Sequence, residues 1–458
     1  MYWYNSGNTS DIKTIEYKLN DGEWTEITSS QDNDGSGTTI ATVITGDTIK
    51  FRGNNDTYCT SSAAYNCFKN TSDCYFYAYG NIMSLINYNN FKTNKKLTKD
   101  RTFAWLFYNT GIMSHPEKKL LLPATILSSY CYQYMFVNCI SLENAPALPA
   151  TTLANGCYFY MFNGCTNLKK TPELPATTLS DGCYKGMFQY CGSLTSAPAL
   201  PATTLANGCY ADMFWGCTSL VNAPELPATT LANQCYQNMF NGCTSLVNAL
   251  SILPATTLTP ACYRNMFAGC TSLVSAPELP ATELKGFCYD GMFSNCISLT
   301  TVPSILPATA LENWSYRNMF NGCTSLTTAP ELPATILAEL CYYSMFERCT
   351  SLVNAPELPA TTLTKECYTK MFNGCTSLTT APELPATTLA ISCYSGMLQG
   401  CKKLNYIKCL ATDISASNCL SYWVGGVASS GTFVKDSSMT SWPSGASGIP
   451  NGWTVQDA

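Results

Sequence analysis

Apolar and polar positions repeat along most of the chain with a period of about 26 residues. Within one period, Cys157, Met161 and Cys165 recur at every fourth position, and Tyr158 and Phe162 each follow one of them. This stripe is typical of a short amphipathic helix of two turns. We therefore expect a helix in the first half of each period.

The second half of each period favours an extended chain. Leu168, Thr171 and Leu174 suit a short strand, while Pro172 interrupts them and Pro175 makes a long hydrogen-bonded strand improbable. Thr177, Thr178 and Leu179 then turn the chain back. Each period thus predicts one coil that holds a short helix and a short strand.

The repeat is best aligned on its Cys-Tyr pairs. Most steps between pairs are 26 residues, two coils carry one extra residue near 250–253 and 303–306, and weaker copies surround Cys74, Phe103 and Cys419. A fixed period between 20 and 50 residues is the signature of a solenoid. The pairs begin at Cys131, Cys157, Cys183, Cys209, Cys235, Cys262, Cys288, Cys341, Cys367 and Cys393.

One coil cannot bury its apolar stripe alone, so the coils must stack and share a core of Cys, Met, Phe and Leu. The fold class that follows is an α/β repeat, a leucine-rich-type solenoid of about 26-residue coils, spanning residues 59–401. The repeat Met-Phe-x-Gly-Cys-Thr-Ser-Leu with a proline-containing return resembles the BspA-type leucine-rich repeats of bacterial surface proteins, over about residues 74–425. The repeat also resembles arrays in phage-encoded tail appendages. The resemblance implies attachment to host or microbial surfaces.

The two ends lack the repeat. In residues 1–58, Ile15–Leu19 and Trp24–Ile27 flank Asn20-Asp21-Gly22 and predict a hairpin, and 38–43 with 48–52 predict a second one. Together they resemble a small immunoglobulin-like β-module. If it lacks a first strand, an open edge permits self-association. Residues 402–458 predict a C-terminal cap over the open core.

Most of the 26 cysteines form pairs eight residues apart, such as Cys157 and Cys165. This spacing does not match structural zinc, and no metal site is expected. Cysteines are lost singly, since Ser315 faces Cys323, so we favour reduced, buried cysteines over disulfides within coils. Cys59, Cys67 and Cys409 lie outside this ladder and can still pair.

Composition excludes several classes of function. Charged residues make up 12% of the chain and the net charge is -5, so there is no polybasic surface for nucleic acid. No apolar run reaches the roughly 20 residues of a membrane span. The first residues lack the pattern of a secretory signal, so a signal has been removed or none is needed.

Nearly every polar residue type recurs in each coil, which argues against a catalytic centre, and no cofactor is expected. His115 is interpreted as an incidental loop residue, and Asp32-Asn33-Asp34-Gly35 as a hairpin loop rather than a calcium loop. A glutamate that recurs in six of the coils is interpreted as part of a solvated edge that discourages association, rather than as a row of cation ligands. These are Glu173, Glu225, Glu278, Glu331, Glu357 and Glu383.

Two positions after Cys-Tyr and two after Met-Phe vary between coils, as exposed positions do. In the N-terminal coils they hold the candidate binding residues Tyr134, Phe159, Tyr160, Tyr190 and Trp215. The sequence therefore predicts a non-catalytic adhesion scaffold, extracellular or at a cell surface, that recognises a glycan or protein. The alternative is a structural subunit of an extracellular or phage tail appendage that self-assembles, located in a virion.

Overall fold

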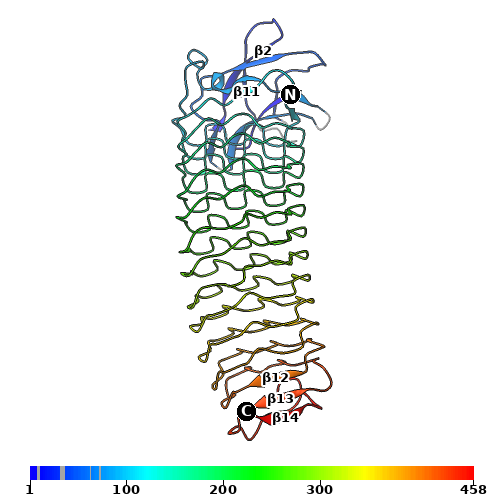
Figure 1. Cartoon of the computed structure of the whole chain (residues 1–458). Helices are drawn as coiled ribbons and strands as arrows, with labels where there is room; N and C mark the ends of the chain where they lie inside the picture. Colours follow the sequence, from blue (N-terminus) through cyan, green and yellow to red (C-terminus); the bar gives the residue numbers. More distant parts are fainter. Residues whose placement is uncertain (8–10, 31–36, 62, 72–73) are drawn as a thin grey trace. The chain divides into compact units, whose positions relative to one another are not determined.

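The computed structural model describes residues 1–7, 11–30, 37–61, 63–71 and 74–458. The chain divides into two compact units. Unit 1 comprises 1–220 with 224–226, and unit 2 comprises 221–223 with 227–458. Within each unit, coils of about 26 residues stack one on the next (Figure 1).

The predicted α/β fold class, with a short helix and a short strand in each coil, is wrong. Within the described ranges there is no α-helix and one short 3-10 helix, η2 (Ile82–Leu85). Where a helix was expected, the chain forms consecutive β-turns. The Met135 amide donates to Tyr132 O at 3.3 Å within its coil, whereas the amides of Tyr132 and Tyr134 donate to Cys157 O and Phe159 O of the next coil, each at 3.0 Å. We call this segment of a coil the turn ladder.

A left-handed residue at every fourth position produces the turn ladder. In one coil these residues are Gly156, Tyr160 and Gly164, with φ of 54°, 52° and 72°. They correspond to positions 26, 4 and 8 of a coil whose Cys-Tyr cysteine is position 1. A conformation that repeats every four residues points positions 1, 5 and 9 inward, and it therefore imitates the apolar stripe of a helix.

The core of each unit consists of side-chain ladders. Tyr158 stacks on Tyr184 with ring centroids 5.7 Å apart, and Phe162 stacks on Phe188 at 5.8 Å. The position-9 thiols donate to the Phe carbonyl of the preceding coil, as Cys165 Sγ does to Phe136 O at 3.0 Å. None of the 26 cysteines forms a disulfide, and all except the half-buried Cys74 are buried. The ladder cysteines thus lie in the core, as expected.

The second half of each coil makes only isolated parallel bridges to its neighbour. Examples are Thr152 with Thr178 in unit 1 and Ser275 with Thr301 in unit 2. Leu168, Leu174 and the other inward leucines are buried. The predicted short strand is also wrong for the coils between residues 121 and 406 of the described chain, since no strand forms there. The prolines remove backbone donors and explain why no ladder of backbone hydrogen bonds develops.

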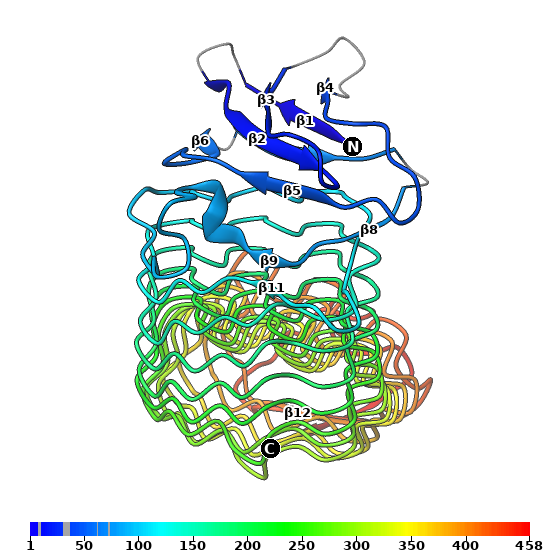
Figure 2. The ribbon, with the colours of Figure 1, turned by 90° about the horizontal axis from the view of Figure 1, so that it is seen from above.

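Unit 1 begins with two small antiparallel sheets, ordered β4-β1-β7-β6 and β3-β2-β5 (Figure 2). The first predicted hairpin is confirmed as β2 with β3. The second is wrong, because β5 pairs with β2 and β4 pairs with β1. The Asn20 side chain, bonded to Asp47 and to the Thr48 amide, directs β5 to β2. The strands are β1 (Tyr2–Asn5), β2 (Thr14–Leu19), β3 (Thr25–Thr28), β4 (Thr38–Thr39), β5 (Ile49–Arg52), β6 (Cys59–Ser61) and β7 (Ala64–Lys69).

The first turn ladder of unit 1 is covered by residues on and before β6 and β7. Tyr58 stacks on Phe103 at 6.2 Å, and Phe68 stacks on Phe107 at 5.5 Å. The segment around Cys74, expected to be a weak coil, instead contributes two short strands that pair in parallel with later ones. These are β8 (Phe76–Tyr77) with β10 (Ile112–Met113), and β9 (Gly80–Asn81) with β11 (Leu120–Leu121).

Unit 2 ends in a parallel sheet of β12 (Tyr406–Cys409), β13 (Thr432–Lys435) and β14 (Thr454–Asp457). The tyrosine ladder of this unit ends on Trp423, which stacks on Tyr394 at 6.3 Å. Trp442 also stacks on Trp423, with ring centroids 6.3 Å apart. The buried indole of Trp423 donates to Gly448 O at 2.9 Å, so the final segment encloses the last coil.

Candidate binding surface

The turn ladder has one face in the core and one face in solvent. Positions 1, 2, 5, 6 and 9 are buried. Positions 3, 4, 7, 8 and 26 form the outer face and carry the residues that vary between coils, most of them exposed or half-buried and some buried. All five predicted binding residues occupy this outer face in unit 1. Tyr134, Phe159, Tyr160 and Trp215 are half-buried, and Tyr190 is 48% exposed.

The structure brings three of the five together. Tyr134 stacks on Tyr160 of the next coil with ring centroids 5.6 Å apart. Phe159 meets Tyr134 edge-on at 5.5 Å and Tyr160 edge-on at 4.6 Å. These rings therefore immobilise one another, and each leaves part of its surface in solvent.

Tyr190 and Trp215 form a second group. Their ring centroids lie 6.1 Å apart at an interplanar angle of 46°. The Tyr190 ring lies against the backbone of Gly216, where an added Cβ would come within 2.5 Å of the ring. Gly216 also has a φ of 72°, so the position requires glycine for two reasons.

A buried carboxylate fixes Tyr160. The Tyr160 hydroxyl donates to Asp212 Oδ2 at 3.3 Å, and Lys185 Nζ lies 3.8 Å from the same oxygen. Asp212 is 6% exposed. Burial raises the pKa of Tyr160, and the Asp212 charge raises it further. Tyr160 thus remains a neutral phenol with a fixed orientation.

Sequence reasoning missed three members of this surface. Trp105 stacks on Tyr134 at 4.2 Å, and Tyr65 stacks on Trp105 at 5.0 Å, so the stack continues toward the β-strands. Tyr130 meets Phe159 edge-on at 6.5 Å. We define the aromatic strip as the residues Tyr65, Trp105, Tyr130, Tyr134, Phe159, Tyr160, Tyr190 and Trp215.

A sequence signal for the strip exists. Tyr130, Tyr160 and Tyr190 are each followed 26 residues later by a glycine, at 156, 186 and 216. In each case the ring lies where a Cβ on that glycine would be, at 2.3 to 2.5 Å. A tyrosine followed by glycine at one coil's distance therefore indicates a ring lying flat over the next coil.

The remaining predicted sites have ordinary structural surroundings. His115 Nδ1 accepts from the amides of Glu117 and Lys118, each at 3.0 Å, and its ring lies edge-on to Tyr77 and Tyr79. The six glutamates of the predicted row are exposed. Asp32-Asn33-Asp34-Gly35 lies outside the described residues.

In the part of the chain that the structure covers, no group of three or more His, Cys, Asp or Glu side chains is placed to hold a metal ion. Within the same part, no helix has the length and apolar character to cross a membrane. Comparison with family models, with curated proteins and with solved structures gives no match.

Proposed function

We propose that the protein is a non-catalytic adhesion scaffold whose aromatic strip binds a glycan or a protein on another cell or microbial surface. The observation that carries this proposal is the concentration of partly exposed, mutually packed aromatic rings on the outer face of unit 1. Ordered aromatic side chains lose little conformational entropy on binding, and they dominate the energetics of many interfaces.

The composition of the outer face supports binding over catalysis. Polar side chains beside the strip are amides and small groups, such as Asn163, which donates to Gln189 Oε1 at 2.8 Å. The nearest buried carboxylate, Asp212, already contacts Tyr160 and Lys185. The resemblance to BspA-type surface repeats fits an extracellular or cell-surface location, and a virion appendage is the alternative.

The proposal is tested by replacing Phe159, Tyr160 and Trp215 together by Ser. Serine occupies the equivalent positions 3, 4 and 7 elsewhere, as Ser395, Ser344 and Ser294, and Ser344 has a φ of 52°. The coil therefore accommodates the change, and we expect loss of binding in glycan-array and cell-binding assays with little change in the melting temperature.

The matched control replaces Gln237, Asn238 and Asn241, at the same three positions of a coil in unit 2, by Ser. It should bind as the parent does. Undiminished binding by a folded aromatic variant would place the contact surface elsewhere. If the aromatic variant loses glycan binding but keeps protein binding, the ligand of the strip is a glycan. The reverse outcome identifies a protein ligand.

A further inference from the structure

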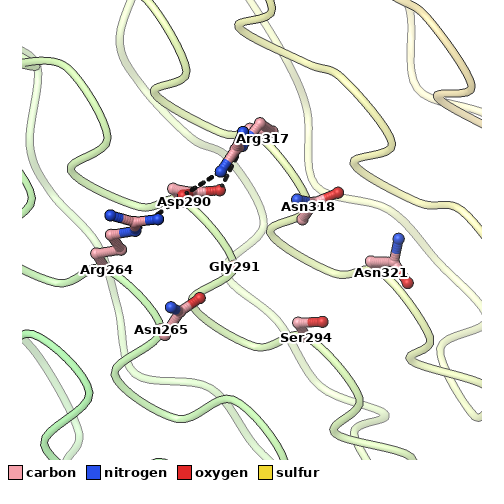
Figure 3. A pocket seen from close by; sticks show the side chains of 8 residues that line it. All are labelled: Arg264, Asn265, Asp290, Gly291, Ser294, Arg317, Asn318 and Asn321. Carbon is pink, nitrogen blue, oxygen red and sulfur yellow. Dashed lines mark hydrogen bonds and ion pairs between the residues drawn. The ribbon is translucent and has the colours of Figure 1, made fainter.

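The outer face of the turn ladder in unit 2 carries a polar pocket of about 300 Å³ (Figure 3). Three successive coils build it from positions 3, 4 and 7, the same positions that carry much of the aromatic strip in unit 1. The lining residues are Arg264, Asn265, Asp290, Gly291, Ser294, Arg317, Asn318 and Asn321. The Asn265 side chain packs against the backbone of Gly291, since a Cβ there would lie 2.2 Å from Asn265 Oδ1.

One wall of the pocket is a buried carboxylate between two guanidinium groups. The side chain of Asp290 is 4% exposed. Arg317 donates to both of its oxygens, from Nε and Nη2, each at 2.9 Å. Arg264 Nε lies 3.1 Å from Oδ2, but this buried N–H forms no hydrogen bond.

The aromatic ring of Phe287 holds both arginines from another side. The Arg264 and Arg317 guanidinium carbons lie 5.3 and 5.8 Å from its ring centroid. Trp314 stacks on Phe287 at 4.4 Å and completes the support. The two cations are therefore ordered before any ligand arrives, which lowers the entropy cost of binding.

The wall has more positive charge and more hydrogen-bond donors than Asp290 uses. Two arginines against one aspartate leave a formal lining charge of +1, and each guanidinium has five N–H donors. Asn265, Ser294 and Asn318 surround the rest of the pocket with groups that both donate and accept. On the opposite side, Asn321 donates to Glu347 Oε2 at 3.2 Å, so the excess of positive charge lies at the arginine wall.

We propose that this pocket binds one carboxylate-bearing monosaccharide unit of a glycan, such as a uronic or sialic acid. The sugar carboxylate lies at the Arg264–Arg317 wall, where charge-assisted hydrogen bonds are strongest. The sugar hydroxyls exchange hydrogen bonds with the amides and with Ser294. A bare inorganic anion offers no donor to the acceptor oxygens of these side chains, and a neutral sugar leaves the excess charge unused. The pocket deepens the proposed adhesive function by naming a ligand class, but it does not require the aromatic strip.

The test measures binding of sodium glucuronate and N-acetylneuraminate to the full chain by saturation-transfer NMR and calorimetry, with glucose and acetate as neutral and carboxylate-only probes. The Ser294→Trp variant fills the pocket without removing a charged partner. Position 7 accepts tryptophan, since Trp215 occupies it in unit 1. Asn373→Trp, at position 7 of another coil of unit 2, is the matched control.

We expect at least one acidic sugar to bind more tightly than glucose and acetate, with about 10-fold weaker binding in Ser294→Trp. Asn373→Trp should leave the affinity unchanged. Arg264→Gln should also weaken binding about 10-fold while leaving the fold intact, because Asp290 keeps both hydrogen bonds from Arg317.

The proposal is overturned if the parent chain does not bind an acidic sugar, or if it binds glucose or acetate equally well. Full binding of the acidic sugar by a folded Ser294→Trp variant also overturns it. The aromatic variant with Phe159, Tyr160 and Trp215 replaced by Ser should still bind the acidic sugar. Failure of the strip and failure of the pocket are therefore distinguishable.

Discussion

The position-9 thiols form hydrogen bonds that link neighbouring coils in the core. The S–H of each donates to a Phe carbonyl of the preceding coil, as in Cys296 Sγ to Phe267 O at 3.1 Å. That carbonyl also accepts the Cys270 amide at 3.1 Å, so it receives two donors. The thiol thus satisfies a second lone pair in the core, which a methyl group of similar size cannot do.

Burial of these thiols predicts that the protein loses stability at alkaline pH. Burial raises the pKa of Cys296 to about 12, whereas an unfolded cysteine has a pKa of about 8.5. Between these values the unfolded chain loses the proton and the folded chain keeps it. The stabilising contribution is therefore complete below about pH 8.5 and falls by about 1.4 kcal/mol per pH unit above it.

Cys296→Ala tests this expectation through urea unfolding between pH 7 and 10.5. The variant should be less stable at pH 7, but the free energy of unfolding should fall with pH less steeply than in the parent, by about 1.4 kcal/mol per unit. Met292→Ala, which empties an equally buried position of the same coil without removing a titratable group, is the control. Parallel pH curves for Cys296→Ala and the parent contradict the expectation.

The turn ladder shows why the sequence predicted the coil but not its conformation. Buried positions 1, 2, 5, 6 and 9 fall within an arc of about 140° on a helical wheel of about 100° per residue, so the apolar pattern fits a helix equally well. The period, the stacking and the core residues could be predicted, whereas the predicted helix and strand of each coil are wrong. The information that separates the two conformations lies at positions 26, 4 and 8, which often hold Gly or Asn, as in Gly156 and Asn138.

The candidate sites show a similar division. Variable positions located the outer face and five members of the strip. The sequence analysis did not predict the pocket, because its lining residues lie far apart along the chain and share no motif. Only alignment by register shows Arg264, Asp290 and Arg317 at position 3 of three successive coils, with alternating charge. Such alternation matters only once the coils are known to lie side by side.

A pair of alanines in one coil distinguishes a turn ladder from a helix in solution. Ala261 is left-handed, with a φ of 54°, whereas Ala268 is not among the residues of positive φ. In a helix, Ala→Gly costs about 1 kcal/mol at either site. In the turn ladder, Ala261→Gly relieves a left-handed alanine, which offsets the greater entropy of the unfolded chain.

We therefore expect Ala261→Gly to leave the free energy of unfolding unchanged or raised, and Ala268→Gly to lower it by about 0.4–1 kcal/mol. Urea denaturation of both variants measures the difference. Glycine occurs naturally at the register of Ala261, as Gly156, Gly182 and Gly208, so the coil accommodates it. Equal losses of unfolding free energy in the two variants would contradict the turn ladder and favour a helix.

At the scale of the whole molecule, the small number of charges becomes important. Thr, Ser, Asn and Gly supply much of the polar surface, and 12% of residues are charged. In unit 2 the exposed edge of the coils carries Glu278, Glu331 and Glu357. Exposed backbone edges are also present, since all four residues of β14 are exposed. Repulsion between like charges is then the main barrier to association, because it keeps such edges apart.

This reasoning predicts that the parent chain is monomeric and that removal of three edge charges promotes association. Replacing Glu278, Glu331 and Glu357 by Gln changes the net charge from -5 to -2 (-5 plus 3). The second virial coefficient from light scattering at low salt should fall from positive toward zero or below. In about 1 M NaCl the two proteins should differ little, because the Debye length there is about 3 Å. Glu23, Glu26 and Glu117→Gln makes the same change in net charge at exposed carboxylates of unit 1, and it separates the effect of the edge from that of total charge. Concentration-dependent assembly of the parent at low salt would instead favour the structural-subunit alternative. Identical virial coefficients for the two triple variants would show that total charge, and not the edge, governs association.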